Sequence, residues 1–240
     1  MKSTFRRLAL AAGAALAMAG PARAYIDYVP MMSVGTWNNN SNVYMSEWRK
    51  HIGQPEKAVA TQGKAAALTT SAGLSPTVVP TRSASNVPAQ LAANYPPDKR
   101  AETERAFREL LDGYRKIEQR FNIPANDLAG AVAAFVAGSW MAYRNSDFPD
   151  ENFPALVSQM RQIIASNPEF LRASAAEKRD MYDQMVIRGL FLATVQMALK
   201  QKPNDAVAAN MRQIAKGNLE QFLKTDAERV QVTAKGLSLN

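Results

Sequence analysis

The side chains that most enzymes use for chemistry are scarce in this sequence. It has 240 residues with no cysteine and one histidine, His51. The lack of cysteine excludes thiol catalysis, disulfides, thiolate zinc sites and iron–sulfur clusters. A single histidine excludes a metal site of several imidazoles, and any Ser-His-Asp triad would have to use His51. No phosphate-binding loop, dinucleotide fingerprint or HExxH motif is present, so the sequence predicts no cofactor site.

The remaining catalytic options would use carboxylates, lysine, tyrosine or serine. Asp127 is the acid of greatest interest, because it adjoins the most apolar stretch of the chain. A pocket near Asp127 that is lined by Tyr114, Trp140 and Tyr143 would suit a small ligand-binding domain or a carboxylate-based hydrolase. The alternative interpretation of Asp127 is structural, since an acid in the first turn of a helix is stabilised by the helix dipole.

Two short stretches have side chains of types that bind metals. The loop 145–152 contains three acids, but their spacing matches no calcium-binding loop, and helix capping explains them as well. Met31-Met32 is the methionine pair to test for copper, because thioethers are soft ligands. Neither pattern is sufficient to predict a metal-ligating residue.

The first 24 residues have the pattern of a secretory signal peptide. Basic residues precede an uncharged run of 13 residues, and small residues predict cleavage between Ala24 and Tyr25. That run is shorter than the ~20 residues that span a bilayer, so we expect no transmembrane segment after cleavage. Removal of the peptide lowers the formal charge from +8 to +4, which argues against nucleic-acid binding. The expected location is the periplasm or the medium.

Residues 25–53 form a predicted N-terminal arm that is rich in aromatic residues and asparagine. Trp37, Tyr44 and Trp48 are its predicted partner-contact residues, because large aromatic side chains are costly to leave exposed in water. The alternative is that these side chains pack against the protein's own helical domain.

Residues 54–90 have the composition of a disordered linker. Most of them are Ala, Ser, Thr, Pro or Gly, few are charged and none is aromatic. Such a stretch buries too little apolar surface to offset the entropy of ordering it. Within it, Val78 and Val79 lie between prolines and could form a short extended contact.

From residue 91 onward, apolar residues recur with the period of a helix. The uncharged helix from Leu128 to Tyr143 is predicted to be the buried centre, and Gly130 and Gly138 would let a neighbouring helix approach closely. Short connections between helices predict antiparallel neighbours. The fold class is therefore an all-α antiparallel bundle of about five main helices in residues 91–240, with a short extended tail.

Local signals set the expected ends of these helices. Asn122 or Asn126 is expected to cap the central helix, and Ser174 with Glu177 forms a capping box for the fourth helix. Gly217-Asn218 is expected to end the fifth helix. The five helices are predicted at about 97–121, 128–143, 154–166, 174–201 and 204–217.

Several short elements of the sequence match a known pattern: Leu91-Ala92, Tyr95-Pro96, Asn126-Asp127-Leu128-Ala129, Tyr143, Lys178 and Gly236-Leu237. On these residues the sequence resembles an uncharacterised family of secreted Gram-negative bacterial proteins with a signal peptide, a low-complexity stretch and an all-helical domain. The resemblance covers about residues 91–237. It implies a fold and an exported location, and it carries over no active-site residues.

Two functions of different classes follow from these patterns. The favoured one is a non-catalytic exported interaction or scaffold module of the bacterial cell envelope, with a cell-envelope protein as partner. The alternative is the ligand-binding domain or hydrolase with a pocket near Asp127. A cavity that reaches Asp127 would favour the second function, and a solid core would favour the first. Homo-oligomerisation is compatible with both.

Overall fold

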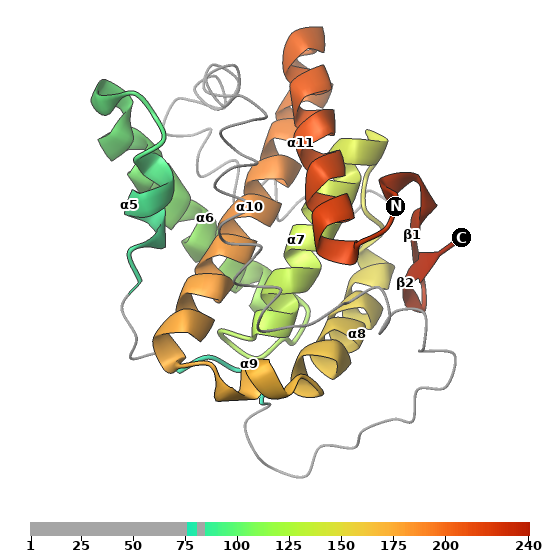
Figure 1. Ribbon diagram of the computed structural model, residues 1–240. Helices are drawn as coiled ribbons and strands as arrows, with labels where there is room; N and C mark the ends of the chain where they lie inside the picture. The colour runs from blue at the N-terminus through green and yellow to red at the C-terminus, as the bar shows by residue number, and fades with distance from the viewer. Residues whose placement is uncertain (1–75, 81–84) are drawn as a thin grey trace.

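The computed structural model describes residues 76–80 and 85–240, which are mostly helical (Figure 1). These residues form seven α-helices and one β-hairpin, joined by short 3-10 turns. The predicted helical domain is confirmed, and the hairpin corrects the strictly all-α class. The helices are α5 Val87–Ala92, α6 Arg100–Arg120, α7 Leu128–Arg144, α8 Phe153–Ala165, α9 Pro168–Arg172, α10 Ala175–Gln201 and α11 Asp205–Leu223. The 3-10 turns are η3 Pro97–Lys99, η4 Asp150–Asn152 and η5 Ala227–Arg229.

Helix α7 is the central helix of the domain, as its uncharged sequence predicted. All residues from Leu128 to Ser139 are buried, and the helix packs against α8, α10 and α11 (Figure 1). Its first charged side chain is Arg144 at its last position. The helix can therefore be surrounded without burial of an ionised group, which would be costly.

Helices α7 and α10 cross at two glycines. A Cβ atom placed on Gly138 would lie 2.0 Å from the carbonyl oxygen of Gly189. A Cβ on Gly189 would lie 2.5 Å from the carbonyl oxygen of Ala134. These distances are far below van der Waals contact, so the two backbones can meet only where no side chain is present. The predicted close approach is confirmed at Gly138, whereas a Cβ on Gly130 would meet the Tyr114 hydroxyl.

Helices α7 and α10, which are not consecutive in the chain, run parallel to each other. The prediction of antiparallel neighbours concerned consecutive helices. Arg179 near the start of α10 bonds to Asn126 just before α7, and Gln196 near the end of α10 bonds to Asn145 just after α7. The reason is the connection. Helix α8 returns the chain to the start of α7, where Arg161 contacts Asp127, so α10 begins at the same end as α7.

Helix α11 is continuous, so the predicted break at Gly217-Asn218 is wrong. Asn218 is buried within the helix, and the apolar stripe continues beyond it through Leu219 and Phe222. Phe222 packs edge-on against Phe135 of α7, with 5.7 Å between the ring centroids. The contact with α7 outweighs the local tendency of a Gly-Asn pair to end a helix.

The predicted extended tail forms a hairpin of β1 Val230–Thr233 and β2 Gly236–Leu239. The register pairs Val230 with Leu239 and Val232 with Leu237. Gln159 of α8 donates from Nε2 to the Leu237 carbonyl oxygen at 3.0 Å, and its Oε1 accepts from the Leu237 amide at 2.7 Å. One side-chain amide thus satisfies both backbone groups of Leu237 and fixes the hairpin on α8.

Part of the predicted linker is structured. Thr77 and Val79 are buried, and residues 87–90 belong to α5, which packs on α6. For residues 76–80 and 85–90, the prediction of a disordered linker is therefore wrong, although the extended contact at Val78 is confirmed. A few buried apolar side chains were enough to offset the ordering entropy. The rest of the predicted linker, the predicted arm and the predicted signal peptide lie outside the described residues.

Within residues 76–80 and 85–240, none of the helices has the length and apolar character needed to cross a bilayer.

Candidate functional site

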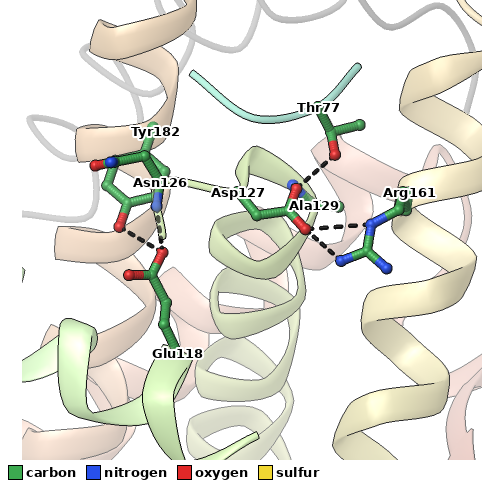
Figure 2. A network of polar contacts seen from close by, with 7 residues as sticks. All are labelled: Thr77, Glu118, Asn126, Asp127, Ala129, Arg161 and Tyr182. Atoms are coloured by element: carbon green, nitrogen blue, oxygen red, sulfur yellow. Dashed lines mark hydrogen bonds and ion pairs between the residues drawn. The ribbon is translucent and has the colours of Figure 1, made fainter. Parts of the chain in front are cut away.

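A group of buried polar side chains lies where α7 begins (Figure 2). The end of α6, the loop before α7, the late part of α8, the start of α10 and the segment 76–80 all meet there. Figure 2 shows two carboxylates, Asp127 and Glu118, each holding side chains or backbone from other segments. We call this set of contacts the junction.

Asp127 is the N-cap of α7 and has no exposed surface. Its Oδ1 accepts from the Ala129 amide at 3.1 Å and from the Thr77 hydroxyl at 2.5 Å. Its Oδ2 forms an ion pair with Arg161 of α8, whose Nε lies 3.2 Å away. The expected capping residues Asn122 and Asn126 are wrong, because both adopt positive φ and only Asp127 presents its oxygen to the first turn. Asp127 thus has a structural role, as the N-cap just before the first turn in which the sequence interpretation placed it.

Backbone hydrogen bonds fasten residues 77–79 beside this cap. The Val79 amide donates to the Asn126 carbonyl oxygen at 2.9 Å, and the Leu128 amide donates to the Thr77 carbonyl oxygen at 3.0 Å. Val78 and Asp127 therefore form an antiparallel bridge. Together with the Thr77 hydroxyl bond, this bridge ties the segment to the start of the central helix.

Glu118 forms the second half of the junction and is almost fully buried. Its Oε1 accepts from the Asn126 amide at 2.9 Å and from the Tyr182 hydroxyl at 2.9 Å. Burial raises the pKa of Glu118, and the hydrogen bonds from Tyr182 and the backbone oppose that rise. Burial, with the Glu118 charge as the next cause, also raises the pKa of Tyr182. Tyr114 packs edge-on against Tyr182, and burial raises its pKa well above the ordinary value.

Arg179 connects Asn126 and Tyr182, the two hydrogen-bond partners of Glu118, to a third buried acid, Asp183. It donates to Asn126 Oδ1 at 2.8 Å, pairs with Asp183 at 3.0 Å and lies over the Tyr182 ring. Burial raises the pKa of Asp183, and the charge of Arg179 opposes this effect. The junction thus contains three buried carboxyl groups, two of them paired with arginine.

A groove of about 860 Å³ opens beside the junction. Buried Glu118 and Asp183 contribute to its wall, and exposed Arg108 and Arg115 of α6 also line it. Arg108 is paired with Glu104, and Arg115 with Asp112. Asp183 and the arginines of this groove are therefore already paired within the protein, and Glu118 is hydrogen-bonded.

The pocket that the sequence suggested is not formed. Asp127 caps the start of α7 while Tyr143 lies near its end, 16 residues or about 24 Å along the helix. Tyr114 is buried beside Tyr182, and Trp140 packs edge-on against Phe148 at 6.1 Å. The grouping of Asp127, Trp140 and Tyr143 in one pocket is wrong, because a straight helix separates its two ends.

Sequence reasoning missed Glu118, Arg161 and Arg179. Glu118 had a usable signal, since it lies four residues after Tyr114 and next to Ile117 on the inward stripe of α6. A charged residue on an apolar stripe indicates a buried polar contact. Arg161 and Arg179 had no comparable signal, because each lies among ordinary polar positions of its helix. Trp37, Tyr44, Trp48 and the cleavage residues Ala24 and Tyr25 lie outside the described residues.

The raised pKa of Glu118 predicts a specific dependence of stability on pH. A folded-state pKa above the unfolded value means that the folded protein holds this proton more tightly. The stabilisation that results from this tighter binding is fully present below the ordinary glutamate pKa of 4.5. It is lost as the pH rises through the raised pKa of Glu118. We expect E118Q to remove this part of the loss, so its melting temperature falls less than that of the wild type between pH 4.5 and 7.5.

The matched control is E104Q, which changes the partly exposed partner of Arg108. Thermal melts of all three proteins across that pH range provide the measurement. If E118Q and the wild type show the same pH dependence, the Glu118 carboxyl does not titrate at a raised value.

Comparison with known proteins gives a family and no function. Residues 4–240 match a family of unknown function, DUF6683. No curated protein and no solved structure matches the chain.

Proposed function

The chain belongs to the family of unknown function DUF6683, and from that premise we propose that it is an exported, non-catalytic interaction module of the bacterial cell envelope. The helical domain is a rigid base, and the N-terminal arm, residues 25–53, contacts a cell-envelope protein. The signal-peptide pattern before Tyr25 supports export. The aromatic composition of the arm supports a contact role.

The observation that carries this proposal is that the three acids of the junction are already bonded by other groups of the protein. Asp127 has both carboxylate oxygens occupied by protein donors, and Glu118 accepts from a backbone amide and from Tyr182. Asp183 is paired with Arg179. A catalytic acid or nucleophile has to reach a substrate atom, and Asp127 is fully enclosed. These acids hold separate segments of the domain together.

The bonds that hold residues 77–79 to the domain support a role for this segment as the attachment point of the arm. Residues 76–80 are the first described part of the chain, and both backbone and side-chain bonds hold residues 77–79 to the start of α7. A force applied to the chain before residue 76 is therefore transmitted to the central helix. An arm that binds a partner would be connected to the domain at this firm point.

Crosslinking in cells tests the proposal. We expect the tagged, exported protein to recover a cell-envelope protein, and deletion of residues 25–53 to abolish that recovery. The variant W37A/W48A should reduce recovery strongly, whereas W140F, which changes the third tryptophan of the chain within the helical domain, should not. Recovery that is unaffected by loss of the arm would contradict the proposed role of the arm.

The same tryptophan variant makes a second, independent prediction. If the arm contacts a partner, W37A/W48A leaves the melting temperature of the purified protein nearly unchanged. Packing of the arm on its own domain would instead give a drop of several degrees, because two buried tryptophans contribute substantial apolar area. Calorimetry of the purified variant and wild type separates these two outcomes.

A further inference from the structure

A second groove, of about 680 Å³, lies at the opposite end of α7 from the junction. The last residues of α7, the end of α10 and the first half of α11 line it. Tyr143 lies in its wall with only 4% of its surface exposed. The volume falls within the roughly 300–1,000 Å³ typical of small-molecule sites.

Two arginines share the ring of Tyr143. The guanidinium carbon of Arg144 lies 5.4 Å from the ring centroid, and that of Arg212 lies 5.6 Å away. Arg144 and Arg212 are both exposed residues. A cation held over an aromatic face loses less rotational freedom when it binds a ligand, because the ring already restricts it. The ring of Tyr143 therefore restricts both guanidinium groups before a ligand binds.

Neither arginine is neutralised by an acid in the described part of the chain. Arg144 Nη2 donates to the carbonyl oxygens of Glu228 and Val230, at 2.6 and 3.3 Å, and forms no ion pair with a described carboxylate. Arg212, which lines the groove, likewise forms no ion pair within residues 76–80 and 85–240. The arginines of the first groove differ, since Arg108, Arg115 and Arg179 all have acidic partners there.

The other charges of the groove favour a ligand with a single negative charge. Lys200 is paired with Asp147, and Lys216 with Glu220. Asp205 and Glu228 also line the groove, and they oppose a doubly charged anion such as phosphate. A carboxylate carries one charge and matches the planar fork of a guanidinium.

We propose that Arg212, which lines this groove and is positioned by Tyr143, binds the carboxylate of a small molecule there, with Arg144 on the same ring and beside Glu228 as a second cation at the edge of the groove. The site goes beyond the proposed function, since neither the arm nor the junction takes part in it. The carboxylate site and the proposed interaction function can be present in one protein, because the groove and the junction lie about the length of α7 apart.

Nuclear magnetic resonance titration of the full chain tests the proposal. The probes are acetate, glycine and, for comparison, inorganic phosphate, and the readout is the backbone amide shifts of residues 205–216. We expect saturable shifts with acetate and glycine, and an affinity at least about tenfold lower in R212Q. Y143L should weaken binding as well, because it removes the surface that positions both arginines.

The matched control is R105Q, on an exposed arginine of α6 that does not line the groove, which should bind as the wild type does. Unchanged melting temperatures show that R212Q and R105Q remain folded, and R212K, which keeps the charge but loses the fork, gives a second test with intermediate affinity expected. Equal affinity of R212Q and the wild type would overturn the proposal. So would shifts with phosphate alone, or no saturable shift with either carboxylate. Partner recovery in the crosslinking experiment is independent of all these outcomes.

Discussion

Replacement of Gly138 by alanine is expected to destabilise the protein more than any other single change considered. The new methyl group would lie 2.0 Å from the Gly189 carbonyl oxygen, which is backbone and cannot turn away. The α7 and α10 axes must separate to admit it, and the contacts around the crossing then loosen. We expect a loss of about 3 kcal/mol or more in the free energy of unfolding, and a melting temperature lower by about 10 °C.

Urea unfolding of G138A, G189A and G217A provides the measurement and its control. G189A should behave like G138A, since its methyl group would meet Ala134 backbone at 2.5 Å. Gly217 lies inside α11, where no comparable obstruction is found, so alanine should stabilise the protein by up to about 1 kcal/mol. If G138A is as stable as the wild type, the helices do not cross at the described distance.

Substitution of Asp127 by alanine is expected to have the second largest effect. The change removes the N-cap of α7, the acceptor for Thr77 and the partner of Arg161. Loss of a cap costs about 1 kcal/mol, and removal of one member of a buried ion pair costs several. Because Arg161 is 31% exposed and can turn toward water, we expect a total loss of about 3 kcal/mol.

Hydrogen exchange distinguishes this mechanism from general destabilisation. The Val79 amide, which donates to Asn126, should lose protection in D127A at denaturant concentrations where α10 amides remain protected. D127N keeps an oxygen for the cap and for Thr77, so its loss should be smaller. The control D112N breaks a pair whose side chains are 69% and 66% exposed, and should cost about 0.5 kcal/mol or less. Retained protection of Val79 in D127A would show that Asp127 does not hold the segment.

The sequence predicted the helices better than their arrangement. Apolar periodicity located the long helices, and the capping box at Ser174 was confirmed together with its reciprocal bond from Glu177. Such signals are local, because they depend on residues three or four positions apart. The parallel direction of α7 and α10 follows from antiparallel consecutive helices. Their close crossing pairs Gly138 with Gly189, about 50 residues apart, and no local pattern records which residues meet there. The Gly217-Asn218 break failed for the same reason, since contact with α7 kept α11 continuous.

The junction was partly predictable. Asp127 was singled out from its position beside an apolar helix, and both its catalytic and its capping interpretation followed from that position alone. Its partners decided between them, and Thr77 and Arg161 lie 50 and 34 residues away in the sequence. The side-chain type of an acid sets what it can do. The donors that the fold brings to it determine what it does.

The parallel direction of α7 and α10 also has a consequence for the order in which the protein can fold. Antiparallel helices joined by a short loop can form as a hairpin while the rest of the chain is still unfolded, but a parallel pair cannot. The bonds that align the ends of α7 and α10 join residues 53 and 51 positions apart. Helix α7 is apolar on all sides, so it remains unprotected until the chain through α10 is available to cover it. A chain that is synthesised from its N-terminus can therefore complete its core only after α10 has been made, about 50 residues later than α7.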